Sequence, residues 1–537
     1  MLFNSSQFLL QFLPLTFAGF LLLHAMRLQR LVPLWLTAAS LLFYCWWRPA
    51  NLPLLMGSMV FNYVLAGRLM QSRSKALLAA GVVANLLLLG VFKYTGFVAE
   101  NLAWVTGAGW NIPHVILPLA ISFFTFQQIA YLVDAHGGRI SERNPINYCL
   151  FITFFPHLIA GPITHHGEML SQFSDQSRFR PRWDFVGVGL TLFLIGLFKK
   201  VVVADPFGVT ASPVFAAAAH GGGVRFVEAW TGALSYALQL YFDFSGYSDM
   251  AIGLGLLFGI ALPLNFDSPY KARNIIDFWS RWHMTLTRFL TAYVYNPIVV
   301  SLTRRRAERR LPLPRRGRMS PGTFVALVAI PTVLTMLISG IWHGAGWQFV
   351  IFGLLHGLYL TVAHAWRTWR AHRGAPVRSD APLVVVGSVL LTFLCVVVAQ
   401  VFFRAENVAA ALDMLRGMAG LNGITLPQPF GASDTVRALA GRLGIGIAPL
   451  PLFEESQAIR IVLFLAVVWT FPNAYQWLRG VPTALDARPR ASWVERFTGQ
   501  ATWQPSVALG LAVGCLSFLS LMLAVSKAPT EFLYFRF

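Results

Sequence analysis

Long apolar runs recur along this chain, and they constrain its fold more than any other feature of the sequence. A helix that crosses a bilayer needs about 20 mostly apolar residues, and about a dozen stretches meet that criterion. Only 12% of the residues are charged and 56% are hydrophobic, whereas globular domains average about a quarter charged residues. The sequence predicts an all-α polytopic integral membrane protein with roughly 11–13 transmembrane helices. Residues 1–537 form a single membrane-embedded domain in this prediction.

Basic residues cluster in loops between the apolar runs. The chain carries 42 Lys and Arg against 22 Asp and Glu, a net charge of +20. Three loops hold many of these residues: 304–318, 367–378 and 479–496. Cytoplasmic loops of membrane proteins are enriched in Lys and Arg, and anionic lipid attracts them. We therefore expect these loops to face the cytoplasm, with the lipid bilayer as their partner, and we expect no nucleic-acid binding.

The same charge pattern places both chain ends, and residues 404–460, outside the cytoplasm. Two interpretations remain open for residues 404–460, which are rich in Gly, Pro and Ala: a small extracytoplasmic cap or a flexible connection. The stretches around Thr153 and over residues 226–262 contain Gly, Pro or acidic residues. We expect these stretches to be broken, and re-entrant or interfacial, which is tolerated where protein shields the backbone.

His343 is the principal candidate for chemistry. In an apolar run, Trp342 and Trp347 flank this imidazole, and Gly344 and Gly346 follow it. An ionisable group at bilayer depth is costly and marks a functional site by default, and an imidazole with a pKa near neutrality suits proton transfer from a hydroxyl. The glycines would let backbone or ligand approach closely, and the tryptophans would form rigid walls.

The alternative for His343 is a histidine that only forms hydrogen bonds between helices. We favour this structural role for His356, which lies later in the same run and lacks such neighbours.

A second histidine, His283, lies in residues 277–286, where Trp, Arg and His recur at helical spacing before a basic loop. In one interpretation, Arg281, Trp282 and His283 belong to an interfacial belt of aromatic and basic residues. In the other, Arg281 and His283 line the entrance for a phosphate-bearing donor.

Polar side chains also gather in residues 241–251, YFDFSGYSDMA. Asp243, Tyr247 and Asp249 must be paired or face water, because an unpaired charge in an apolar setting costs several kcal/mol. Two interpretations remain open. Either these residues orient an imidazole or bind a sugar, or the carboxylates cap a broken helix and pair with an arginine.

We expect no metal site. His165 and His166 adjoin a Gly/Pro-rich turn, but Glu168 is the one close carboxylate and no cysteine is near. The motifs HExxH, GxSxG and the P-loop pattern GxxxxGKS/T are absent from the sequence. A zinc protease, a serine hydrolase and a nucleotide-hydrolysing pump therefore lose their usual support.

Five segments carry a family resemblance. They are LPLAISFFTFQQIAYLVD (117–134), FPHLIAGP (155–162), YFDFSGYSDMAIG (241–253), FWSRWHMTLTRFLTAYVYNP (278–297) and IWHGAGWQFVIFGLLHGLYL (341–360). In this order they resemble the membrane-bound O-acyltransferase family, specifically its alginate O-acetyltransferase and teichoic-acid D-alanyl-transfer branch. The last residues, EFLYFRF (531–537), are similar to the aromatic tail of alginate-type members, although an interfacial anchor would look the same.

The resemblance implies a helical fold around a central funnel, with His343 as the catalytic histidine and His283 as the second histidine of the signature. It implies acyl transfer from a cytoplasmic thioester, with acetyl-CoA as the donor and no tightly bound cofactor. The expected acceptor is a hydroxyl of an exopolysaccharide such as alginate, and the expected location is the bacterial inner membrane. An extracytoplasmic acetyltransferase is the expected partner, because the chain carries no soluble catalytic domain.

Two other functions remain open. A teichoic-acid D-alanylation protein would take its acyl group from a carrier-protein thioester. A transporter would use intramembrane His and Asp side chains as a proton or substrate path. Transporters often contain inverted repeats, and we find none in the sequence.

Overall fold

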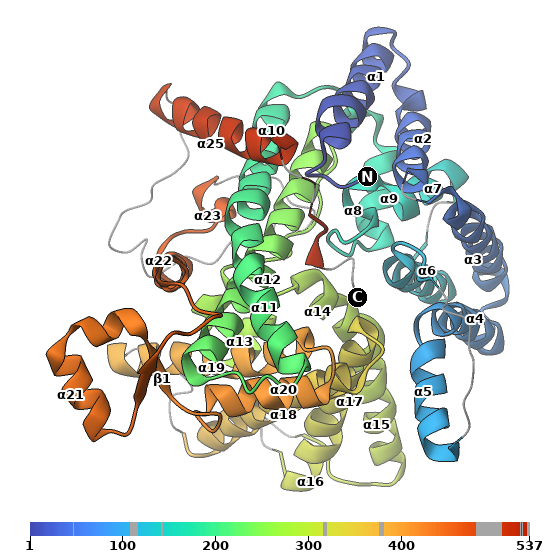
Figure 1. The fold of residues 1–537 in the computed structure, drawn as a ribbon. Helices are drawn as coiled ribbons and strands as arrows, with labels where there is room; N and C mark the ends of the chain where they lie inside the picture. Colours follow the sequence, from blue (N-terminus) through green and yellow to red (C-terminus); the bar gives the residue numbers. More distant parts are fainter. Residues whose placement is uncertain are drawn as a thin grey trace. The chain divides into compact units, whose positions relative to one another are not determined.

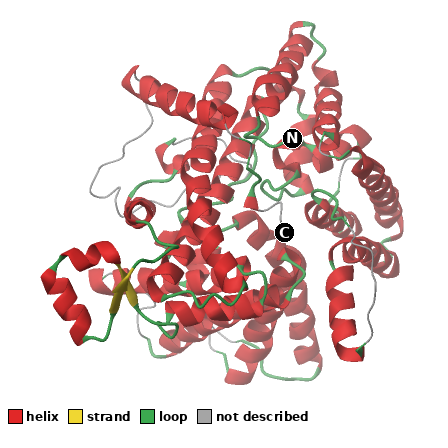
Figure 2. Cartoon of the chain, viewed as in Figure 1, coloured by secondary structure: helices red, strands yellow, loops and turns green. Residues whose placement is uncertain are grey.

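The computed structural model describes residues 1–46, 48–107, 116–140, 143–314, 319–374, 381–478, 507–526, 528 and 530–533. Helices make up nearly all of the regular structure of these residues, and one two-stranded sheet is the exception (Figure 1 and Figure 2). The prediction of an all-α polytopic membrane protein is confirmed.

The chain forms two compact units. Unit 1 comprises Met1–Val202, Asp243–Asn265 and Asn473–Phe537, and unit 2 comprises Val203–Phe242 and Phe266–Pro472. Two helices cross the sequence boundaries of the units: the π-helical turn η5 (Lys199–Ala204) and α12 (Phe226–Leu257).

Among the described residues, the α-helices that lie wholly in unit 1 are α1 (Leu13–Ala25), α2 (Val32–Cys45), α3 (Leu52–Ser72), α4 (Lys75–Lys93), α5 (Thr95–Thr106), α6 (Ile121–His136), α7 (Pro145–Thr153), α8 (Phe155–Leu158), α9 (His166–Ser174), α10 (Trp183–Phe198), α23 (Ala474–Trp477) and α25 (Val507–Ser526). Those of unit 2 are α11 (Asp205–Ala219), α13 (Ile275–Trp279), α14 (Met284–Leu290), α15 (Asn296–Glu308), α16 (Pro321–Phe324), α17 (Ile330–His343), α18 (Trp347–His372), α19 (Pro382–Arg404), α20 (Val408–Met418), α21 (Asp434–Arg442) and α22 (Glu455–Thr470). Unit 2 also contains the strands β1 (Thr425–Pro427) and β2 (Gly446–Ala448).

Seven helical stretches of the described residues are long and apolar enough to cross a membrane. They are Phe8–Ala25, Pro49–Ser72, Lys75–Lys93, Trp183–Ala219, Pro321–His343, Trp347–His372 and Pro382–Arg404. The basic loop over residues 479–496 lies outside the described residues, as do residues 315–318 and 375–378 of the other two basic loops. The orientation derived from these loops stays a prediction.

Proline marks the start of many of these helices. α1, α2, α3, α17 and α19 each carry a proline in the first turn. Proline is tolerated there because the first N–H groups of a helix have no intrahelical partner, and because its φ is already near the helical value. The helix starts are thus encoded in the local sequence.

The chain is broken after Thr153, as predicted, because α7 ends there and the one-turn α8 follows. In contrast, α12 is one continuous helix, so the prediction that residues 226–262 are broken is wrong for most of that stretch. Its glycines serve close packing: a Cβ on Gly246 would lie only 2.8 Å from the carbonyl oxygen of Gly196 in α10. Small residues let membrane helices approach this closely, and Asp243 and Asp249 of α12 are paired with lysines.

Residues 404–460 are a folded part of unit 2, and the interpretation as a flexible connection is wrong. The segment contains α20, α21 and the parallel pair β1 and β2, drawn in yellow in Figure 2. Hydrogen bonds attach it to the start of α12. Trp230 Nε1 donates to the Met418 carbonyl oxygen at 3.0 Å, and the Leu452 N–H donates to Glu228 Oε1 at 3.2 Å.

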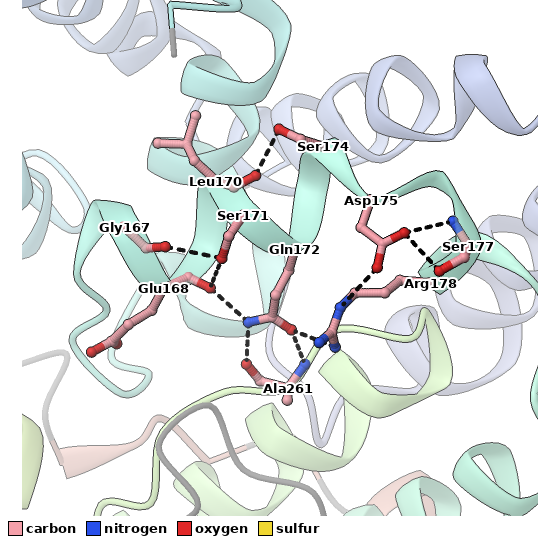
Figure 3. Close-up of polar contacts among 10 residues, drawn as sticks. All are labelled: Gly167, Glu168, Leu170, Ser171, Gln172, Ser174, Asp175, Ser177, Arg178 and Ala261. Atoms are coloured by element: carbon pink, nitrogen blue, oxygen red, sulfur yellow. Dashed lines mark hydrogen bonds and ion pairs between the residues drawn. The ribbon is translucent and has the colours of Figure 1, made fainter. Parts of the chain in front are cut away.

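In unit 1, the side chain of Gln172 holds the turn that follows α12 (Figure 3). Its amide nitrogen donates to the carbonyl oxygen of Ala261 at 3.0 Å, and its amide oxygen accepts from the Ala261 N–H at 2.9 Å. Arg178 donates to the same amide oxygen at 3.3 Å. Gln172 is buried, so it provides the backbone of this turn with hydrogen-bond partners where water is excluded.

We expect Gln172→Leu to destabilise the purified protein, because the N–H and C=O groups of Ala261 lose their side-chain partner. A buried backbone group left unpaired costs about 1–3 kcal/mol. Thermal unfolding in detergent, followed by circular dichroism, measures the change. Ser171→Ala is the matched control, since Ser171 is exposed and donates to backbone carbonyls of its own helix, α9. Equal melting temperatures for the two variants would contradict the prediction.

Candidate active site

His343 is the last residue of α17 and is 4% exposed. Three aromatic rings contact its imidazole: Trp342 at 4.8 Å, Phe403 of α19 at 5.0 Å and Phe352 of α18 at 6.0 Å between ring centroids. We call these three rings the aromatic cage. Because the cage excludes water, it strengthens the electrostatic interactions of the imidazole with a bound group. The role of His343 as a general base stays a prediction.

Close packing of α17 on α18 holds this cage together. A Cβ on Gly340 would lie 2.9 Å from Gly353 Cα, so the two backbones are in direct contact. Any larger residue at either position would push the helices apart. The contact keeps Phe352, the neighbour of Gly353, against His343.

The glycines after His343 are also closely packed. A Cβ on Gly344 would overlap the ring of Phe349, and one on Gly346 would lie 2.7 Å from Gln348 Nε2. Gln348 is itself held, because its Nε2 donates to a backbone carbonyl of the α19–α20 turn at 3.1 Å. Side chains of the protein therefore fill the space beside both glycines. The close approach of a ligand to Gly344 and Gly346 stays a prediction.

The two tryptophans that flank the imidazole in the sequence have different surroundings. Trp342 is buried against His343. Trp347 begins α18 and is 56% exposed, so it covers the site much less than Trp342 does. An exposed tryptophan at a helix end suits a membrane interface.

His283 immediately precedes α14 and is 1% exposed. Its backbone lies in the left-handed region, with φ 43° and ψ 51°. This conformation costs a non-glycine residue about 1–3 kcal/mol and is concentrated at functional sites. Burial lowers the pKa of the His283 imidazole to about 3, so the ring is neutral at pH 7. A neutral ring suits the predicted role in orientation or proton transfer.

Arg281 is held by two carboxylates. Its Nε donates to Asp277 Oδ1 at 3.0 Å, and its Nη1 lies 3.8 Å from Asp267 Oδ2. The same Nη1 donates to the Asp267 carbonyl oxygen at 3.1 Å. The guanidinium charge is therefore balanced within unit 2, and contact with a donor phosphate would compete with these partners. That contact stays a prediction.

A series of ring contacts connects the two predicted histidine segments. Trp282 stacks on Phe278 at 5.6 Å, and Phe278 stacks on His356 at 6.3 Å. His356 contacts the cage residue Phe352 at 4.7 Å. The structure thus brings both segments, which lie about 60 residues apart in the sequence, onto one aromatic cluster of unit 2.

His356 has a structural partner. Trp279 Nε1 donates to its Nδ1 at 3.2 Å, which places the ring proton of the neutral imidazole on Nε2. The hydrogen bond joins α13 to α18 and agrees with the structural role that the sequence favours for His356.

Asp243, Tyr247 and Asp249 lie in unit 1, whereas the other predicted site residues lie in unit 2. Asp243 pairs with Lys200 at 2.7 Å, and Asp249 pairs with Lys199 at 2.6 Å. Both carboxylates are inside the continuous helix α12. The interpretation in which they cap a broken helix and pair with an arginine is therefore wrong.

Sequence reasoning missed the two lysines. Lys199 and Lys200 interrupt the apolar stretch Trp183–Ala219, where a charged side chain is costly. This cost could have identified them from the sequence, because a lysine in an apolar stretch needs an acidic partner from another part of the chain.

His165 and Glu168 serve the local fold as the capping box of α9. The His165 N–H donates to Glu168 Oε2 at 3.4 Å, and His166 Nδ1 lies 4.0 Å from Asp134 Oδ2. Within the described ranges, no three His, Cys, Asp or Glu side chains are grouped so as to hold a metal ion.

Comparison with known proteins identifies the family. Residues 138–310 match the model of the membrane-bound O-acyltransferase family. A peptidoglycan O-acetyltransferase of Helicobacter pylori is 43% identical over 456 residues, which cover 79% of this chain and 81% of the relative. A probable alginate O-acetylase of Azotobacter vinelandii is 35% identical, and the alignment covers 100% of both chains. The chain belongs to the membrane-bound O-acyltransferase family. It is thus an O-acyltransferase, and the transporter interpretation is wrong.

The resemblance derived from the five sequence segments is confirmed. The matched family model includes His283 and ends before His343, whereas the alginate-type relative is aligned over the whole chain. A teichoic acid D-alanyltransferase of Streptococcus thermophilus is 28% identical over 46% of this chain and 57% of the relative. The part played by each site residue in this O-acyltransferase stays a prediction.

We expect His283→Gly and His283→Ala both to lower acyl transfer, by about 10²-fold or more if the imidazole moves or orients a proton. The glycine variant separates the side chain from the backbone, because glycine adopts φ near +43° without strain and keeps the chain path. Initial rates and melting temperatures of both purified variants provide the measurement. An active His283→Gly beside an unstable His283→Ala would mean that His283 serves only the backbone.

Proposed function

We propose that this O-acyltransferase transfers an acetyl group from acetyl-CoA toward a hydroxyl of an exopolysaccharide such as alginate, in the bacterial inner membrane. The observation that carries the proposal is similarity over the whole chain to probable alginate O-acetylases. The relatives in Azotobacter vinelandii and Pseudomonas aeruginosa are 35% and 34% identical over the full length of this chain. The buried imidazole of His343 inside its aromatic cage supplies a fitting base.

In the proposed reaction, His343 removes the proton of the acceptor hydroxyl while the hydroxyl oxygen attacks the thioester carbonyl carbon. The carbon–sulfur bond then breaks, and coenzyme A leaves as a thiolate that takes the proton back from the imidazolium. General acid–base catalysis of this kind contributes about 10²–10⁴-fold to the rate. The aromatic cage would keep water, a competing acceptor, away from the thioester.

The acceptor hydroxyl belongs either to the polysaccharide or to an extracytoplasmic acetyltransferase that completes the transfer. Peptidoglycan is the second candidate polymer, because the relative named a peptidoglycan O-acetyltransferase is 43% identical. D-alanyl transfer has less support, since its relative matches only about half of this chain.

Deletion of the gene is expected to remove O-acetyl groups from the secreted polysaccharide, and a plasmid copy of the wild type should restore them. His343→Gln should fail to restore them although the protein is inserted at a normal level, because glutamine cannot take up the proton. Acetate released by mild alkali from purified exopolysaccharide, and separately from peptidoglycan, gives the measurement. His372→Gln, at an exposed histidine of α18, is the matched control.

Restoration of acetylation by His343→Gln would refute the assignment of the base. If only peptidoglycan lost its acetyl groups, the acceptor would be peptidoglycan and not an alginate-type polymer.

Orientation in the membrane is an independent prediction. In a background without the four native cysteines, Arg310→Cys should react with a membrane-impermeant thiol reagent only from the cytoplasmic side, and Gly431→Cys only from outside. The physical reason is the positive charge of the loop around Arg310. Labelling of intact cells and of inverted vesicles measures it. The reverse pattern would move the thioester to the other side of the membrane and contradict the proposal.

A further inference from the structure

The ion pair of Lys200 and Asp243 is buried inside unit 1. Its Nζ and Oδ1 atoms lie 2.7 Å apart, and each side chain is only 2% exposed. Lys200 belongs to the apolar stretch Trp183–Ala219, where a charge is costly. Desolvation of two buried charges often offsets their attraction, and an apolar pair of the same size is frequently as stable. A contribution to folding stability is therefore not enough to explain why this ion pair is present.

The same two side chains bind a remote segment of the chain, residues 530–533. Lys200 Nζ donates to the carbonyl oxygen of Glu531 at 3.0 Å, and the N–H of Leu533 donates to Asp243 Oδ2 at 3.0 Å. The two bonds engage backbone groups on either side of Phe532. Lys200 thus donates to one main-chain group of the segment and Asp243 accepts from another, so the ion pair binds the segment by its main chain.

Phe532 supplies a side-chain anchor between these two bonds. It is 1% exposed, its ring lies edge-on to Tyr247 at 4.8 Å, and Lys200 Nζ lies 4.8 Å from the centre of the ring. The cation and the ring attract each other strongly where water is excluded. Tyr247 is in turn stacked on Phe3 at 4.9 Å.

The N-terminal end of the chain completes the contact. Asn4 Nδ2 donates to the Thr530 carbonyl oxygen at 3.1 Å. Four residues near the C-terminus thus meet side chains from three other segments of unit 1: the N-terminal residues, η5 and α12. The neighbouring pair of Lys199 and Asp249 is joined at 2.6 Å, and none of the hydrogen bonds above involves it.

We propose that Lys200 and Asp243 form a docking site for the chain's own segment 530–533, that Phe532 is its anchor, and that docking is required for acyl transfer. Lys200, Asp243 and Phe532 are positioning residues in this proposal, because they order the segment and do not touch the reacting atoms. If the segment left, Lys200 Nζ and Asp243 Oδ2 would lose hydrogen bonds in a buried site, so the docked state is strongly favoured. The requirement for transfer rests on the proposed function, whereas the docking does not.

Glu531 offers a reporter of docking in the full-length protein. Its side chain is exposed, but its carbonyl oxygen is bound to Lys200 and the next residue is buried. A glutamate-specific protease should therefore cleave after Glu531 slowly, at a rate set by the undocked population. Mass spectrometry of the released residues 532–537 measures this rate.

The main test is the double variant Lys200→Met with Asp243→Leu, which removes both charges together and leaves neither unpaired. We expect it to fold, to be cleaved after Glu531 at least about tenfold faster than the wild type, and to lose acyl transfer. Lys199→Met with Asp249→Leu is the matched control, and its cleavage after Glu531 should equal that of the wild type. Lys200→Arg keeps a cation and its donors, so it should retain both protection and transfer.

If the double variant fails to fold, Phe532→Ala provides the same readouts with the ion pair intact, and faster cleavage and lost transfer are expected there too. Unchanged cleavage in these variants would overturn the docking site. Normal acetylation by a protein whose segment is released would overturn the requirement for docking. Absence of acetyl transfer by the wild type would instead count against the proposed function, and cleavage would still decide the docking.

Discussion

A charge that is buried among apolar residues must be paired or neutral, and the organisation of both units depends on this constraint. In unit 1, Lys199 and Lys200 each pair with a carboxylate of α12. In unit 2, Arg281 is held by Asp267 and Asp277. The imidazole of His283 meets the constraint by being neutral, because burial lowers its pKa. The two lysine–aspartate pairs hold segments that are far apart in the sequence at defined positions.

Close helix packing supplies the rest of the geometry around the candidate base. Lipid provides no hydrophobic drive between helices, so small residues that allow backbone contact decide where helices meet. Gly340 and Gly353 let α17 and α18 touch, which puts Phe352 against His343. The imidazole therefore sits at a helix end with aromatic rings around it. These rings keep water away from the imidazole.

Much of the fold was predictable from local sequence, and the failures share one cause. Apolar length indicated the helices, and His343 and His283 stood out because of their neighbours in the sequence. α12 was expected to be broken because Asp243, Asp249 and its glycines are unfavourable in a helix taken alone. Lysines of η5 pair with the two aspartates, and α10 packs closely against the glycines. Neither η5 nor α10 is near these residues in the sequence. The same distance hid the two lysines from sequence reasoning.

The sequence by itself determined the class of this protein, its family and the identity of the candidate histidines, because apolar runs and short motifs are local properties. Tertiary structure alone decided which polar groups are partners. It assigned Asp243 to Lys200 and to residues 530–533, it placed Asp267 beside Arg281, and it filled the space beside Gly344 with Phe349. The physical reason is that hydrogen bonds, ion pairs and van der Waals contacts act over a few ångströms in space, whatever the distance along the chain.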